Sequence, residues 1–104
     1  MTFKDDITAR IQTDFAENAS MATSMLIDAI IKTDYLRSDR IIRCILFLAN
    51  GDLNNLTEYI EVAILDPRDI ILLAEYERFN NDINVKRLRD FNHTFEASTI
   101  NVKE

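Results

Sequence analysis

The sequence has little of what a β-sheet protein needs for its turns, with a single glycine and a single proline among 104 residues. Tight turns between antiparallel strands usually recruit Gly, Pro or Asn-Gly, so this scarcity argues against a sheet built from hairpins. Helices joined by a few short connections need fewer such residues. Apolar residues make up 47% of the chain, which is too many for a chain that is disordered by composition. The sequence therefore predicts one all-α protein.

Cysteine and histidine are equally scarce, with one of each, Cys44 and His93. Structural zinc usually takes four such ligands, and a single cysteine cannot form an internal disulfide. Cys44 stands among Ile42, Ile45 and Leu46, which predicts a buried and unreactive thiol. His93 lies in a polar stretch that is typical of a surface histidine. The chain has neither a glycine-rich phosphate loop nor a Glu-x-x-His pair, so we expect no catalytic site, no cofactor and no metal.

Long apolar runs are also absent, the longest being 44–49 and 70–74. A helix that spans a bilayer needs about 20 apolar residues, so we expect no membrane partner. The first residues lack the basic start and apolar stretch of a signal peptide, and the lone cysteine fits a reducing compartment, so we expect a cytoplasmic protein. Eighteen acidic and twelve basic residues give a net charge of −6. A nucleic-acid backbone would repel such a chain unless its positive charges were concentrated, so we expect no nucleic-acid partner.

The spacing of apolar residues predicts four to five helices, arranged as a compact bundle or a stack of helical hairpins. Helical periodicity extends over 5–33, which forms either one long helix or two helices divided near Asn18 and Ser20, both capping residue types. Capping and breaking residues then predict three further helices, at 38–50, 52–65 and 67–79. A short fifth helix over 84–95 is an open alternative, followed by an irregular tail. We assign residues 1–80 to a helical core and 81–104 to a strap or tail that packs on the core or on a partner.

The helix predicted at 38–50 is apolar on nearly every side, which is typical of a buried helix. It nevertheless carries Arg40 and Arg43. Buried arginines must reach water along their stems or pair with carboxylates. Glu75 is expected on a solvent-exposed face with Glu77. We expect an intramolecular ion-pair network with candidates at Asp28, Asp34 and Asp69; an anion site or a partner-facing patch is the alternative.

The sequence also predicts more apolar surface than a chain of this size can bury. The helix at 67–79 has two apolar faces and therefore needs two neighbours. Large exposed apolar patches usually mark an interface, and two-fold dimers are the commonest solution. The alternative is that residues 83–104 cover this surface within one chain. The candidate interface residues are Leu72, Tyr76, Phe79, Leu88 and Phe91.

These features favour a non-enzymatic helical module for protein–protein interaction, with a second copy of the chain as the expected partner in a homodimer. An alternative is an immunity or antitoxin-type protein that neutralises a basic partner through its acidic surface. Carboxylates gathered densely on one exposed face would favour that alternative, whereas scattered carboxylates would count against it.

Overall fold

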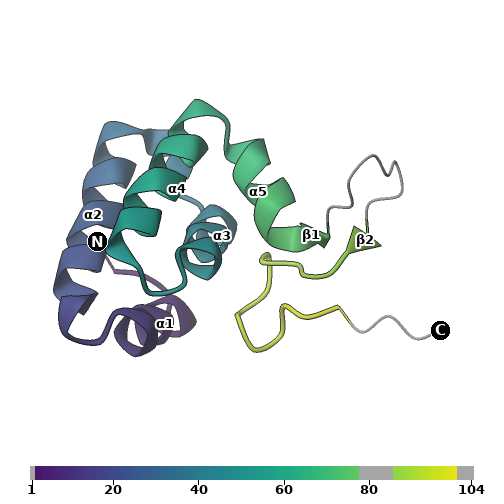
Figure 1. The fold of residues 1–104 in the computed structure, drawn as a ribbon, viewed down its shortest axis with the longest axis horizontal. Helices are drawn as coiled ribbons and strands as arrows, with labels where there is room; N and C mark the ends of the chain where they lie inside the picture. Colours follow the sequence, from purple (N-terminus) through teal and green to yellow (C-terminus); the bar gives the residue numbers. More distant parts are fainter. Residues whose placement is uncertain (1, 78–85, 101–104) are drawn as a thin grey trace.

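The computed structural model describes residues 2–77 and 86–100, and its helices pack into one body (Figure 1). Two short 3-10 helices, η1 (Ala16–Asn18) and η2 (Asp34–Leu36), connect longer elements, and β1 (Tyr76–Glu77) pairs antiparallel with β2 (Lys86–Arg87). The prediction of a compact all-α fold is confirmed. In the described part of the chain the α-helices are α1 (Asp5–Phe15), α2 (Ala19–Lys32), α3 (Asp39–Ala49), α4 (Leu53–Leu65) and α5 (Pro67–Glu75).

Helix α3 is the centre of the fold. All six residues from Ile41 to Leu46 are buried, as its all-round apolar sequence predicts. It packs against α1, α4 and α5, while α2 and α4 lie side by side and run in the same direction (Figure 1). The core is therefore organised around one short helix, and the longer α2 and α4 cover one side of it.

The starts of α3, α4 and α5 follow from their capping residues. Ser38 accepts a hydrogen bond from the amide of Ile41, and Asp52 accepts one from Asn55. Asp66 accepts the amide hydrogen of Arg68, with proline in the first helical position. Each cap satisfies an amide that has no partner within its own helix. These local interactions place the three helix starts within a residue of their predicted positions.

The region 5–33 forms two helices rather than one. Ala16 adopts a positive φ of 49°, which an alanine rarely does, and this residue ends α1. The apolar stripe nevertheless continues, because Phe15 before the break and Ala22 after it are both buried. The side chain of Asn18 does not cap α2. The break between α1 and α2 therefore lies near Asn18, as the two-helix alternative predicts, but Asn18 does not provide the expected cap.

The turn between α3 and α4 lies directly against the end of α1. Gly51 in this turn has a φ of +80°, and an added Cβ would lie 2.5 Å from the carbonyl oxygen of Asp14. Only glycine combines this backbone conformation with so close an approach. The single glycine of the chain thus allows the turn to pack directly against the end of α1.

Two predicted helix ranges are wrong. Helix α5 ends at Glu75 rather than at residue 79, because Tyr76 and Glu77 are extended and pair with Lys86 and Arg87. Within the predicted helix at 84–95, the described residues form β2 and turns. Several of their backbone amides donate to groups outside the segment, such as the carbonyl of Glu75, which accepts from residues 88 and 89. Residues 78–85 lie outside the described residues.

None of the helices in the described ranges has the length and apolar character needed to cross a bilayer.

Candidate interaction surface

Residues 86–100, which we call the C-terminal strap, lie across the core and cover part of it. Phe91 inserts its ring against Phe47 of α3 at a centroid distance of 5.4 Å and is only 1% exposed. The guanidinium of Arg89 lies 4.3 Å from the centre of the Phe47 ring, and that of Arg10 in α1 lies 4.6 Å from the Phe95 ring. The strap is therefore an integral part of the hydrophobic core.

This arrangement separates the five residues predicted to form an interface. Phe91 faces the interior of its own chain rather than a partner. Tyr76 and Leu88 are half-buried, whereas Leu72 is 44% exposed. Phe79 lies outside the described residues. The described members of the set thus do not form one open apolar patch, because the strap occupies the surface that the sequence assigned to a partner.

A buried carboxylate, Glu75, fastens the strap to the core. It is fully buried and accepts hydrogen bonds from Arg40 at 2.7 and 2.9 Å, from Arg87 at 2.9 Å and from the amide of Phe91 at 3.0 Å. Burial alone raises the pKa of Glu75, but the donors outweigh it and hold the pKa below its ordinary value. Glu75 is therefore ionised and joins α3, α5 and the strap.

A second anchor joins the strap to α1. The guanidinium of Arg43, itself buried, donates to both carboxylate oxygens of Asp6 at 2.9 and 3.0 Å and to the carbonyl of Phe91 at 3.1 Å. Asp6 also accepts the amide hydrogen of Phe95 at 3.1 Å. Burial raises the pKa of Asp6. These donors lower it by more, so the pKa of Asp6 lies below its ordinary value. The strap is thus held by two carboxylates, Asp6 near the start of α1 and Glu75 at the end of α5.

Arg40 and Arg43 do form ion pairs, but not with the carboxylates expected from the sequence. Asp28 pairs with Lys32 at 3.0 Å, one helical turn away, and Asp34 pairs with Arg37 at 3.5 Å. Both pairs are exposed and local, so these aspartates are already paired at the surface. Asp69 is exposed on α5. The partners of Arg40 and Arg43 are instead Glu75 and Asp6.

Replacing Arg43 with methionine tests the second anchor. The substitution keeps the apolar stem but leaves Asp6, which is mostly buried, without its cation, so we expect the free energy of unfolding to fall by about 2–4 kcal/mol. Urea denaturation measures the change. An Asp6→Asn variant and the double variant complete a cycle, in which the two losses should be far from additive. Equal stability of Arg43→Met and the unaltered chain would show that the pair contributes nothing.

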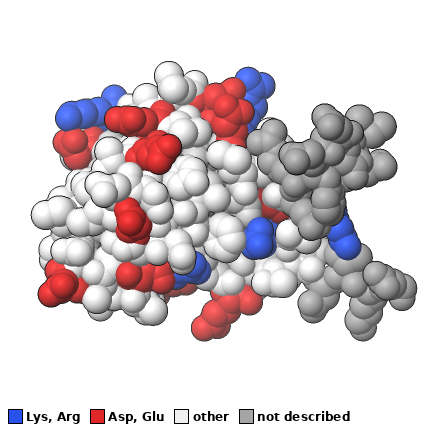
Figure 2. All heavy atoms as spheres, viewed as in Figure 1, with Lys and Arg blue, Asp and Glu red and all other residues white. Residues whose placement is uncertain are grey.

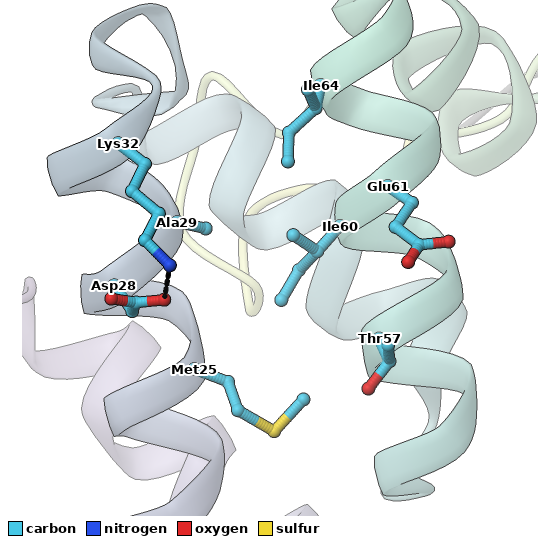
Figure 3. Close-up of a pocket in the computed structure, with 8 residues that line it drawn as sticks. All are labelled: Met25, Asp28, Ala29, Lys32, Thr57, Ile60, Glu61 and Ile64. Atoms are coloured by element: carbon cyan, nitrogen blue, oxygen red, sulfur yellow. Dashed lines mark ion pairs between the residues drawn. The ribbon is translucent and has the colours of Figure 1, made fainter.

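A different apolar surface remains open, as a groove between α2 and α4 (Figure 3). Its volume is about 270 Å³. Met25 and Ala29 form the α2 wall, and Ile60 and Ile64 form the α4 wall, with the methionine side chain extending into the space between them (Figure 3). The charged and polar residues along its edges are Asp28, Lys32, Thr57 and Glu61.

Exposed apolar side chains extend this groove at both ends. Met21 precedes Met25 by one helical turn and is 57% exposed. At the other end Ile64 is 37% exposed and Tyr35 51% exposed, and the Tyr35 hydroxyl donates a hydrogen bond to the carbonyl of Ile64. Methionine side chains adapt readily to the shape of a binding partner. We call the groove together with Met21 and Tyr35 the α2–α4 face.

The charges on the visible face are dispersed. Figure 2 shows acidic side chains in separate groups across this view, both at its edge and within it, with basic side chains near several of them. A protein that neutralises a basic partner is expected to gather its carboxylates on the contact surface. The scattered arrangement on this face weighs against the immunity or antitoxin alternative.

Cys44 and His93 do not come together into a catalytic pair. Cys44 is buried in α3, where desolvation and the nearby charge of Glu75 raise the pKa of its thiol. His93 is exposed on the strap, with its Nε2 3.7 Å from a carboxylate oxygen of Asp90. The described residues contain no group of three or more side chains suited to hold a metal ion.

Comparison with known proteins gives no relative for this chain. No protein-family model matches it, and neither a curated protein nor a solved structure is similar to it.

Proposed function

We propose that this protein is a non-enzymatic helical module for protein–protein interaction, and that it pairs with a second copy of itself in the cytoplasm. One observation carries the proposal: the α2–α4 face keeps Met21, Tyr35 and Ile64 exposed beside an apolar groove, whereas the strap covers the apolar surface around Phe47. Contiguous apolar surface of this kind usually marks a site of protein contact.

The physical basis is the burial of apolar area. Each Å² removed from water contributes roughly 25 cal/mol, and the α2–α4 face presents this area on two packed helices that need little rearrangement to bind. A preformed surface loses less conformational entropy on binding than a mobile one. Two-fold symmetry uses the same surface twice, which is the commonest way in which soluble chains associate.

Light scattering over a concentration series tests the proposal. We expect the measured mass of the full chain to rise with concentration towards twice the mass of one chain, which is 12.1 kDa. Replacing Ile64 with aspartate places a charge on the wall of the groove, so the dimer dissociation constant should rise at least about tenfold, because a desolvated charge without a partner opposes association.

A matched control introduces the same charge elsewhere. Thr13 is exposed on α1, outside the α2–α4 face, so a Thr13→Asp variant should associate like the unaltered chain. A full chain that stays monomeric at every concentration would contradict self-association.

A further inference from the structure

We infer that the second copy docks on the α2–α4 face about a two-fold axis parallel to both helices, so that Lys32 of each copy pairs with Glu61 of the other. The inference rests on the proposed self-association and specifies its geometry. Two such ion pairs would flank a central apolar contact made by the two grooves.

The position of the charges on the groove walls supports this axis. Lys32 belongs to the α2 wall and Glu61 to the α4 wall, and the ammonium and the carboxylate lie at similar heights on opposite sides (Figure 3). A two-fold rotation about an axis along the groove exchanges the walls but preserves height along the helices. It therefore brings Lys32 of one copy, which shares its wall with Asp28, against Glu61 of the other.

The other two-fold arrangement in the plane of the face lacks this match. An axis across the helices would place α2 on α2 of the second copy, with the two helices antiparallel. The α2 side chains that line the groove run from Met25 to Lys32, so an axis across the middle of the groove would place Lys32 against the apolar Met25 of the second copy. An ammonium desolvated against an apolar side chain is unfavourable. The axis along the groove avoids this contact.

Both charged groups are accessible for pairing between copies. The Lys32 side chain is 72% exposed and its present partner Asp28 is 62% exposed, so this helical pair contributes little to stability. Glu61 is also exposed. Lys32 can lay its apolar stem on the groove while its ammonium reaches the second copy, and it need not leave Asp28 to do so.

The mixture of charges also favours a second copy over a basic helix of another protein. A uniformly basic partner would approach Lys32 as well as Glu61, and like charges in an interface cost affinity. A second copy presents Glu61 to Lys32 and Lys32 to Glu61, and the Asp28 carboxylate on the α2 wall is already paired with Lys32 at 3.0 Å. Each Lys32 ammonium would then lie between Asp28 of its own chain and Glu61 of the second copy.

Charge reversal tests the pairing. We expect Lys32→Glu and Glu61→Lys, made singly in the full chain, each to raise the dimer dissociation constant about tenfold. Lys32→Glu combined with Glu61→Lys restores opposite charges across the axis, so its dissociation constant should return to within about threefold of the unaltered value. Glu17→Lys, exposed on η1, is the control of matched charge change and should have no effect. Circular dichroism checks that every variant keeps its helices.

The outcomes distinguish this inference from the function on which it rests. If the unaltered chain dimerises and the single reversals dimerise equally well, the pairing is overturned while self-association stands. If the single reversals weaken the dimer but the double variant does not recover, the two-fold axis along the groove is overturned. If the unaltered chain is monomeric at every concentration, the proposed function fails, and this geometry fails with it.

Discussion

Replacing Phe91 with alanine should lower the free energy of unfolding by about 3–5 kcal/mol, the range for removing a buried phenylalanine ring. The ring is 1% exposed and packs between Phe47 and Phe95. Its loss leaves a cavity beneath the strap and removes the largest apolar contact between the strap and α3. Urea denaturation followed by circular dichroism measures the change.

The control for Phe91 is Leu72, which is 44% exposed on α5 and was assigned to the same interface from the sequence. A Leu72→Ala variant should lose no more than about 1 kcal/mol, because exposed apolar groups contribute little to folding. If Phe91→Ala kept full stability and instead weakened association, Phe91 would belong to an interface between chains.

Replacing Glu75 with glutamine should lower the free energy of unfolding by about 2–4 kcal/mol. The amide has nearly the shape of the carboxylate, but its nitrogen donates hydrogen bonds and so opposes the donors from Arg40, Arg87 and the Phe91 amide. The side chains of Arg40 and Arg87 are partly exposed to water. Leaving them without a carboxylate partner therefore costs less stability than it would for fully buried cations. Urea denaturation at neutral pH measures it.

The same variant should also change the response to acid. The folded-state pKa values of Glu75 and Asp6 are lowered, so their contribution is present above the unfolded-state carboxyl pKa of about 4 and is lost as the pH falls below it. The unaltered chain should therefore lose stability below about pH 4, and Glu75→Gln should lose less. Glu58→Gln, exposed on α4, should keep both the neutral-pH stability and the acid loss. An acid response unchanged in Glu75→Gln would contradict a role for this carboxylate.

The helices that the sequence predicted well are those defined by local interactions. Ser38, Asp52 and Asp66 each cap the helix that begins beside them, and Pro67 occupies a first helical position. A cap and the amide that it binds are two or three residues apart, so both are visible in one short stretch of sequence. The apolar character of α3 on nearly every side, which predicts its burial, is likewise visible in one short stretch of sequence.

The anchors of the strap depend on residues far apart in the sequence. Arg40 is 35 residues from Glu75, and the Phe95 amide is 89 residues from Asp6. An apolar pattern indicates that a face is buried but does not say which charged residue lies opposite. A usable signal was present at Glu75, since it follows Ile71 by one helical turn and adjoins the buried Ala74. A carboxylate that is buried at the edge of an apolar face needs a cation beside it. Arg40 and Arg43 are the basic residues on the helix that is predicted to be buried.

The contact between Asp6 and Phe95 also determines when the described core can close during synthesis. A ribosome adds roughly 5–20 residues per second, so the stretch from Glu75 to Phe95 takes on the order of one to four seconds. During that interval a nascent chain has the residues of all five described helices, yet Phe47 lacks its aromatic neighbour until Phe91 is added, and Asp6 lacks the Phe95 amide until the end. Translation that stops before Phe91 is added yields a chain that contains the residues of each of these helices but leaves Phe47 without its cover, and we expect cellular quality control to treat it as unfolded.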